Sequence, residues 1–336
     1  MDLYKLGRMP YVQALNVQQV LFENLKNRSS SPNFFRGKTR VSVDVQNKID
    51  LLNHHKQPNE EDPNSTRSTA SLPLAANAQH SIDAINPLLP QPPTPPTSAT
   101  TQNDPNELLP RNSLILVEHE PVYTIGIRST NYNDNYVSKL KSKLDEHKLR
   151  ADFIKTNRGG LITFHGPGQL VAYPILHLDD FKEIVPNRSV KAYVSKLERT
   201  IIETLKKVGL DGAHTTKEYP GVWLDEGERK IAFVGIACKR YVTMHGISIN
   251  CDCDLTWFDQ IVSCGIEDKL ITSVRQEMTR TGKRNLVDRH STNKNHRHTS
   301  KTLTENQDYG VDQIADAFCL SFSELFDCTL KERNLN

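Results

Sequence analysis

The chain has 336 residues, 37% of them hydrophobic, and a formal net charge of +2 at pH 7. So small a charge points to no particular acidic partner, and no run reaches the roughly 20 apolar residues that span a bilayer. Residues 1–10 lack the apolar region of a secretory signal, and with Asp2 beside only Lys5 and Arg8 they make a poor transit peptide. The six cysteines of so long a chain are expected to be reduced thiols rather than a disulfide framework.

The first predicted element is a helix within residues 1–28. Its apolar residues recur at a spacing that suits an amphipathic helix, namely Val12, Leu15, Val17, Val20, Leu21 and Leu25.

The segment 29–110 is predicted to be a low-complexity disordered insertion. No aromatic residue occurs between Arg36 and Val122, and the segment is rich in proline. A stretch so poor in large apolar side chains cannot offset the entropy of ordering itself. A proline-binding partner and a passive linker both remain open for it.

The segment 111–278 is predicted to be a folded core, because short β-rich runs alternate there with turns and at least one helix. Its first notable patch is 158–169, where glycines at 159, 160, 166 and 168 indicate a backbone that turns tightly. The spacing is neither a dinucleotide fingerprint nor a phosphate loop. A ligand site and a purely structural turn are both compatible with the glycines alone.

The second patch, 219–236, is typical of a β-hairpin with a glycine-containing loop, and Lys230 opens its return strand. Alternation places Lys230, Ala232 and Val234 on one face. If that face is internal, Lys230 is a buried cation that is costly without a role; if it is external, Lys230 is an ordinary edge lysine.

The third patch, 243–266, ends with Cys264 beside Gly265. Such a cysteine is a candidate nucleophile, although most cysteines are small buried hydrophobes. Cys251 and Cys253 suggest a metal site with Cys238 or His245, but the spacing is not a standard zinc pattern, so we expect no metal.

The segment 279–306 is predicted to be a basic disordered loop. It contains seven arginines and lysines and three histidines but no interleaved aromatics, so a solvated loop is favoured over phosphate binding and no nucleic-acid partner is expected. The segment 307–336 contains a second amphipathic helix. Strands and helices interleave along the chain, which predicts an α/β or α+β fold.

Together the three patches resemble the lipoyl(octanoyl) transferases, the octanoyl-acyl-carrier-protein:protein N-octanoyltransferases, of the eukaryotic mitochondrial type. That family carries Arg-Gly-Gly-x-x-Thr-aromatic-His-x-x-Gly-Gln-x-x-x-Tyr-Pro, matched at 158–174. It also carries a Gly-Val-Trp hairpin ending in Lys-Ile-Ala, a His-Gly-x-x-x-Asn segment, and a Cys-Gly-Ile. Both insertions depart from its compact pattern, as do Cys251 and Cys253. Ser248 stands where alanine is usual, and Ser263 where proline is common.

The resemblance implies a biotin/lipoate protein ligase-like catalytic domain, a mixed sheet with flanking helices, and makes 111–278 its catalytic core. It also implies a cysteine–lysine pair, Cys264 and Lys230. A thiolate at Cys264 would attack the octanoyl thioester of an acyl carrier protein, and Lys230 would transfer protons. Backbone amides near 159–160 and Gly246 would stabilise the oxyanion.

By the same resemblance, the substrate-binding residues are Arg158, Gly159, Gly160, Leu161, Ile162, Thr163, Phe164, His165, Phe233, Val234, Gly235, Gly246, Ile247 and Ser248. His165 is assigned a contact role, with a catalytic Cys–His pair as the alternative. The implied acceptors are lipoyl domains of 2-oxoacid dehydrogenase E2 subunits and the glycine cleavage H protein. The protein is expected to be a mitochondrial monomer that uses neither ATP nor a metal, in the first step of lipoate cofactor synthesis. An ATP-dependent lipoate or biotin ligase and a non-catalytic scaffold are the alternative functions.

Overall fold

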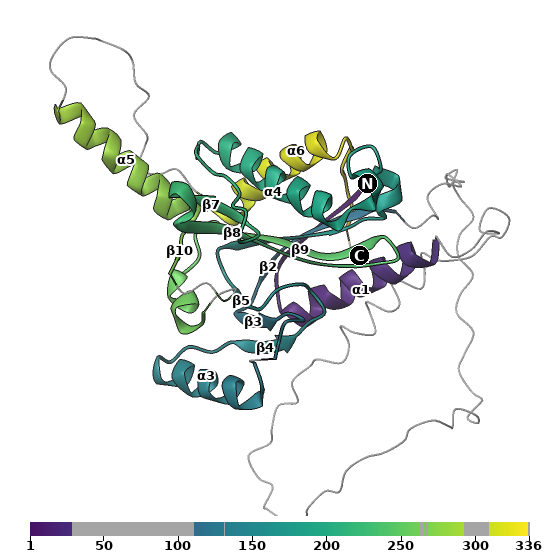
Figure 1. Cartoon of the computed structure of the whole chain (residues 1–336), viewed down its shortest axis with the longest axis horizontal. Coiled ribbons are helices and arrows are strands. Elements are labelled where there is room, and N and C mark those ends of the chain that lie inside the picture. The colour runs from purple at the N-terminus through teal and green to yellow at the C-terminus, as the bar shows by residue number, and fades with distance from the viewer. Residues whose placement is uncertain (29–110, 131, 263–264, 266–267, 292–308, 335–336) are drawn as a thin grey trace, which may run out of the picture.

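The computed structural model describes residues 1–28, 111–130, 132–262, 265, 268–291 and 309–334 (Figure 1). They form a larger mixed sheet, a small three-stranded sheet, and helices on both faces of the larger sheet. Three predicted features lie outside the described residues: the insertion 29–110, the nucleophile Cys264, and the part of the basic loop at 292–306.

The strands are β1 Asp2–Met9, β2 Ser113–His119, β3 Val122–Ile125, β4 Asp152–Lys155, β5 Ile162–His165, β6 Gln169–Ile175, β7 Val222–Leu224, β8 Arg229–Lys239, β9 Val242–Asn250, β10 Leu270–Ile271 and β11 Lys331–Glu332. The α-helices are α1 Tyr11–Arg28, α3 Asp134–Glu146, α4 Val190–Lys207, α5 Val274–Ser291 and α6 Val311–Leu325. Short 3₁₀ turns are Leu178–Phe181, Pro186–Arg188, Asp225–Gly227 and Leu255–Gln260.

The larger sheet has the order β10-β8-β9-β6-β2-β1-β11, with β7 paired to β8. Its β2, β6, β9 and β8 are joined antiparallel, whereas β1 is parallel to β2 and β11, and β10 is parallel to β8. The predicted class, an α/β fold with a mixed sheet and flanking helices, is confirmed. The predicted hairpin is also present as the antiparallel pair β7 and β8.

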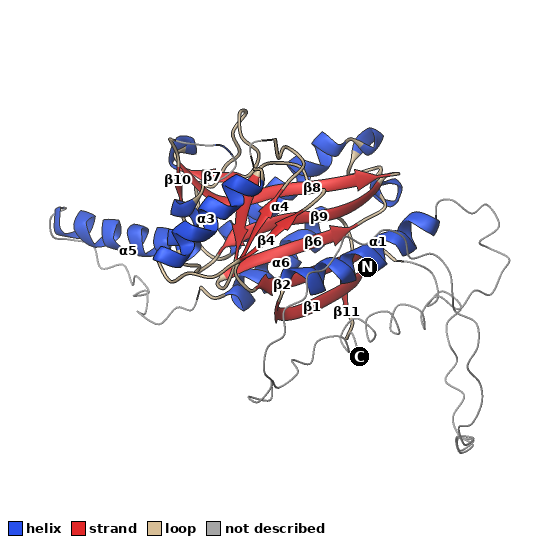
Figure 2. Ribbon diagram, turned by 90° about the horizontal axis from the view of Figure 1, so that it is seen from below, coloured by secondary structure: helices blue, strands red, loops and turns tan. Residues whose placement is uncertain are grey.

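Side-chain alternation along β6 divides the interior into two cores. Leu170 and Ala172 belong to the core on the face covered by α4 and α6, whereas Val171 and Tyr173 belong to the core on the face covered by α1. In Figure 2, α1 lies across the near face of the larger sheet. Because successive strand residues point to opposite faces, a strand covered on both sides is buried along its whole length, and every residue of β6 is buried. A third core joins the small sheet, order β4-β3-β5, to α3 and the turn Leu255–Gln260.

Three predicted segments differ from the structure at their boundaries. The segment 1–28 contains β1 before its helix, and 307–336 ends in β11, because these two strands pair with each other at positions far apart in the sequence. The predicted basic loop is wrong in its first part, because α5 continues to Ser291. Residues 279–291 contain no proline and several good helix formers, so a helix that begins at Val274 can extend through them.

Phe322 of α6 lies in the core that α4 and α6 form with the larger sheet. This ring is fully buried and stacks on Phe326, with ring centroids 4.2 Å apart and planes 11° apart. We predict that Phe322→Ala lowers the free energy of unfolding by about 3–5 kcal/mol, the usual cost of emptying a large core site. The control Leu320→Ala removes a side chain of the same helix that is 61% exposed, so it should change stability by less than about 0.5 kcal/mol. Urea unfolding of both variants measures this, and equal losses would contradict the packing described.

Candidate active site

The glycine-rich patch forms the loop that leads into β5, and Arg158 anchors it. The Arg158 guanidinium is 7% exposed and donates to the Thr124 carbonyl at 2.6 Å and to the Thr124 hydroxyl at 2.8 Å. The amide of Gly159 donates to the carbonyl of Ile236 on β8 at 2.8 Å. One loop therefore joins the small sheet, through Thr124 on β3, to the larger sheet. That bond also occupies the Gly159 amide, which corrects its expected role as an oxyanion donor.

A buried chain of hydrogen bonds orients His165. Asn250 donates from Nδ2 to the Thr272 carbonyl at 2.9 Å, so its Oδ1 accepts from Gln169 Nε2 at 2.8 Å. Gln169 Oε1 is then the acceptor that lies 2.6 Å from His165 Nδ1. Because an amide oxygen can only accept, Nδ1 of His165 carries the proton and its Nε2 is the unprotonated nitrogen. Burial, followed by the proximity of His119, lowers the pKa of His165 to about 3, so the ring is neutral at pH 7.

Tyr11 at the start of α1, together with His119 and Tyr173, forms a second group of polar side chains beside His165. Tyr11 lies parallel to His165, with 6.2 Å between ring centroids. His119 Nδ1 donates to the Met9 carbonyl at 3.3 Å, so its Nε2 accepts from the Tyr173 hydroxyl at 2.7 Å. Burial lowers the pKa of His119 to about 4 and raises that of Tyr11 to about 12. These groups are therefore uncharged near neutral pH.

Lys230 belongs to the internal face of the hairpin, since it is only 2% exposed. Its Nζ donates to the Pro220 carbonyl at 2.8 Å and lies 4.9 Å from the ring centroids of Trp223 and Phe233. Aromatic faces attract a cation that has lost water. The turn closes tightly over it, because a Cβ on Gly221 would lie 2.8 Å from Lys230 Cε.

Glu198 of α4 is the nearby carboxylate, and the sequence analysis did not identify it. Its Oε1 accepts from the Gly221 amide at 2.8 Å. Burial raises the pKa of Glu198, while that hydrogen bond and the positive charge of Lys230 act in the opposite direction. The spacing of residues along α4 predicts only that one face of the helix is buried. No local pattern in the sequence therefore indicates that Glu198 lies beside Lys230.

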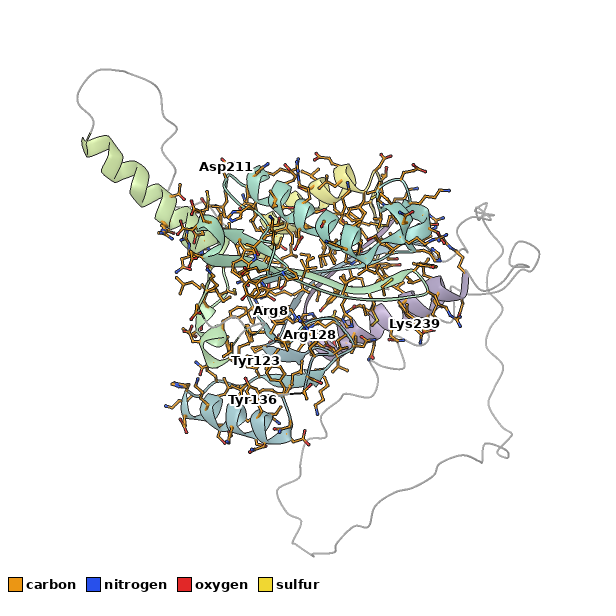
Figure 3. The ribbon with its side chains drawn as sticks, in the orientation of Figure 1. Arg8, Tyr123, Arg128, Tyr136, Asp211 and Lys239 are labelled. Atoms are coloured by element: carbon orange, nitrogen blue, oxygen red, sulfur yellow. The ribbon has the colours of Figure 1, made fainter. Side chains whose placement is uncertain are left out.

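A cavity of about 50 Å³ lies between the larger sheet and the glycine-rich loop. It is lined by Tyr11, Arg158, Gly159, Gly160, Thr163, His165, Val171, Tyr173, Phe233, Val234, Gly235, His245, Gly246, Ile247 and Ser248. In Figure 3, Tyr123 marks β3 of the small sheet, Arg128 marks the loop after it, and Lys239 marks the far end of β8 beside α1. Gly246 is required where β9 passes this cavity, because a Cβ there would lie 2.1 Å from the Ala172 carbonyl oxygen.

All predicted substrate-binding residues line this cavity except Leu161, Ile162 and Phe164. Ile162 and Phe164 instead face the third core, where Phe164 stacks on Trp257 with centroids 4.9 Å apart. This follows from alternation along β5, which turns Thr163 and His165 to the cavity. The cavity is also lined by four residues that were not predicted from the sequence, namely Tyr11, Val171, Tyr173 and His245. The same period-two pattern on β6 could have identified Val171 and Tyr173.

The predicted nucleophile Cys264 lies outside the described residues, but its neighbour Gly265 is described. A Cβ on Gly265 would lie 2.7 Å from Leu161 Cδ1, so this point of the chain contacts the loop that lines the cavity. Cys251 and Cys253 are buried, and burial raises the pKa of both thiols, that of Cys253 to about 12.

Within the described part of the chain, no group of three or more histidine, cysteine or acidic side chains is arranged to hold a metal ion. Over the same residues, no helix has both the length and the apolar character needed to cross a membrane.

The fold and site define an α/β enzyme whose cavity lies between two sheets and has a buried lysine close to its wall. The sequence profile of the lipoyl protein ligase A/B catalytic domain matches residues 99–290. The mitochondrial octanoyl-acyl-carrier-protein:protein N-octanoyltransferase of Danio rerio is 51% identical over 169 residues, 50% of this chain and 69% of the relative. The octanoyltransferase of Christiangramia forsetii is 41% identical over 180 residues, 53% and 72% of the two chains. A lipoate-protein ligase A bound with ATP superposes with a TM-score of 0.45 and 13% identity, over 66% of this chain and 76% of the other.

The chain therefore belongs to the lipoyl protein ligase A/B catalytic-domain family. It is an acyltransferase of the octanoyltransferase kind. The relatives from fly, zebrafish and frog are all named mitochondrial, and the location of this protein is accordingly mitochondrial.

The neutral buried histidines predict how stability depends on pH. The pKa values of His119 and His245 are lowered to about 4, and that of His165 to about 3, from about 6.5 in the unfolded chain. Between pH about 6.5 and about 4 the unfolded chain binds more protons, so stability is complete above this window and falls as the pH decreases. We predict that His119→Gln reduces the slope of the free energy of unfolding against pH by up to about 1.4 kcal/mol per pH unit.

Urea unfolding at pH 7, 6 and 5 measures the effect, and His147→Gln, which changes an exposed side chain at the end of α3, is the control. If His119→Gln and the control show the same pH dependence, His119 does not remain neutral in the folded protein.

Proposed function

We propose that this protein transfers an octanoyl group from the thioester of an acyl carrier protein to a lysine of lipoyl domains. The observation that carries the proposal is the buried Lys230 ammonium beside Phe233, an aromatic side chain that lines the cavity. A lysine 2% exposed is costly to bury, and a role in proton transfer explains why it is retained. The acceptors would be the lipoyl domains of 2-oxoacid dehydrogenases and the glycine cleavage H protein.

The first half-reaction places the acyl group on Cys264. A cysteine at its reference pKa of about 8.5 is mostly thiol at pH 7, and a neighbouring ammonium favours the thiolate. The thiolate attacks the thioester carbonyl, the carrier thiolate departs, and Lys230 gives it a proton. The proposal is supported by Gly265, the next residue in the sequence, because a Cβ added there would lie 2.7 Å from Leu161 Cδ1 on the glycine-rich loop.

In the second half-reaction the acceptor lysine attacks the octanoyl-Cys264 thioester. The now neutral Lys230 takes the proton of the attacking amine, and the Cys264 thiolate leaves. Conversion of a thioester to an amide is downhill, so we propose that neither ATP nor a metal takes part. Octanoyl transfer measured without ATP separates this function from that of an ATP-dependent ligase and from a non-catalytic scaffold.

A Cys–His pair with His165 is less well supported by the geometry. His165 Nδ1 is bonded to Gln169, and a base with a pKa of about 3 is too weak to hold a thiol as its thiolate at pH 7. The orientation of the ring suits a contact with the acyl group, which is the role that we propose for it.

The first test concerns the nucleophile. We predict that Cys264→Ala abolishes transfer and the octanoyl thioester on the enzyme, both followed by mass spectrometry. Cys251→Ala and Cys253→Ala are the controls, because burial keeps these cysteines as thiols, and most activity should remain. Full activity in Cys264→Ala would contradict the proposed mechanism.

A second test concerns Lys230. Lys230→Met removes the charge at similar length, so the thiol pKa of Cys264 should rise towards about 8.5. Alkylation by iodoacetamide at pH 7 should slow and transfer should collapse. Lys230→Arg keeps a charge but cannot act as a base, so some alkylation and little transfer should remain.

The matched control for this pair of variants is Lys239→Met, at the exposed far end of the same strand (Figure 3). Identical curves of alkylation against pH for the wild type and both Lys230 variants would require the dyad to be abandoned.

A further inference from the structure

The face of α4 that packs against β7 and β8 contains a carboxylate, Glu198, which is only 8% exposed (Figure 1). The structure describes the whole of this helix, and its other buried residues are uncharged, namely Tyr193, Leu197, Thr200, Ile201, Thr204 and Leu205. A buried carboxylate costs free energy unless it is paired. Its partners therefore indicate why an acid is placed there.

A single peptide unit joins Glu198 to Lys230. Glu198 Oε1 accepts from the amide of Gly221 at 2.8 Å, and the carbonyl of Pro220 accepts from Lys230 Nζ at 2.8 Å. That amide and that carbonyl belong to the same peptide, so the positive end of its dipole faces the carboxylate and the negative end faces the ammonium. Hydrogen bonds to charged groups are the stronger ones, and bonds in such a chain polarise one another. The carboxylate thus strengthens the Pro220 carbonyl as an acceptor for Lys230.

The turn that carries this peptide lies directly on the lysine. Gly221 has a φ of +120°, a conformation that other residues rarely adopt, and a Cβ there would lie 2.5 Å from the Ala232 carbonyl oxygen and 3.3 Å from Lys230 Nζ. So close an approach requires that the turn be held in one place. The hydrogen bond from the Gly221 amide to Glu198 holds it against α4.

Other titratable side chains beside the hairpin are those of His214, Tyr219, Asp225, Arg229, Glu277 and the proposed nucleophile Cys264. By strand alternation Arg229 faces away from Lys230, and it pairs with Asp225 and, at 2.8 Å, with Glu277. Burial raises the pKa of Glu198, and the Gly221 amide and the charge of Lys230 oppose that rise. An interaction between two charges is reciprocal, so the carboxylate equally favours the ammonium of Lys230.

We propose that Glu198 is the positioning residue of Lys230. Through the peptide unit between Pro220 and Gly221, its carboxylate holds the ammonium beside Phe233 at the wall of the cavity and keeps it charged. The inference rests on the proposed function, because the need for a charged Lys230 comes from its role in proton transfer.

The charge of Glu198 suits both half-reactions. In the first, Lys230 can protonate the departing carrier thiolate only if it begins as an ammonium. In the second, neutral Lys230 takes the proton of the attacking amine, and a nearby carboxylate makes it a stronger base by stabilising the ammonium that forms. Glu198 itself gains and loses no proton in either step.

The test compares Glu198→Gln, Glu198→Ala and the control Glu203→Gln in the full chain. Glu198→Gln keeps an oxygen that can accept from the Gly221 amide and removes only the charge, whereas Glu198→Ala removes the acceptor as well. Glu203 lies on the same helix and pairs with Arg199 at 2.7 Å on the surface. Its variant therefore makes the same change of charge away from Lys230.

The titration of Lys230 is followed by NMR of protein labelled at the ε-carbon of lysine, with the signal assigned by its loss in Lys230→Met. We expect the midpoint to move to lower pH by about one unit in Glu198→Gln, because the opposite charge is gone, and to stay unchanged in Glu203→Gln. In octanoyl transfer, kcat of Glu198→Gln should fall about tenfold with little change in KM, and the loss of activity at alkaline pH should begin earlier. Glu198→Ala should be slower still, because the turn loses its hydrogen bond.

An unchanged midpoint of Lys230 in Glu198→Gln would overturn the proposal, and so would a wild-type kcat of this variant across the pH range. Equal kcat in Glu198→Ala and Glu198→Gln would also overturn it, because the bond to Gly221 would then contribute nothing. If Glu198→Ala does not fold, Glu198→Gln alone decides. The NMR titration needs no substrate, so failure of the wild type to transfer octanoyl would count against the proposed function and not against the position of Glu198.

Discussion

The burial of Arg158 is the constraint on which the site depends. A guanidinium taken out of water is tolerated only when its donors are paired, and Arg158 pairs them with the hydroxyl and carbonyl of Thr124 and with the carbonyl of Gly159. These contacts hold the small sheet against the larger one, with the cavity between them. The same charge also acts at a distance, since it contributes to the lowered pKa values of His165 and His245. The buried cation thus fixes the geometry of this side of the cavity, while burial, more than its charge, keeps the histidines neutral.

The polar groups around the cavity are ordered by backbone carbonyls rather than by solvent. The carbonyl of Thr272 orients Asn250, which orients Gln169, which in turn determines the tautomer of His165. Every link is buried, so a reversal of one amide would leave buried atoms unpaired, and that penalty keeps the arrangement unique. In contrast, Thr163, His245 and Ser248 each carry a buried atom that has no hydrogen-bond partner among the residues that the structure describes.

Lys230 occupies a different kind of environment, on the other side of Phe233. Two aromatic rings, the Pro220 carbonyl and the charge of Glu198 compensate its burial. These partners come from the hairpin or from α4, but the backbone of Lys230 is also linked to the network that holds His165. Its carbonyl accepts from the Thr272 amide at 2.9 Å, and the Thr272 carbonyl accepts from Asn250 at 2.9 Å. In the proposed chemistry, one side of the cavity holds the acyl group and the other transfers protons.

The sequence by itself determined the elements whose signals are local. The glycine-rich patch, the hairpin of β7 and β8, the helices around Tyr11 and Phe318, and the mixed α/β class all follow from periodicity, turn residues and motif spacing. Tertiary structure alone decided whether Lys230 faces inward, because alternation defines two faces but not which of them is covered. It also decided the pairing of β1 with β11, which joins the two ends of the chain, and the approach of Glu198 to Lys230. These features depend on contacts between residues far apart in the sequence, and no local pattern encodes such distances.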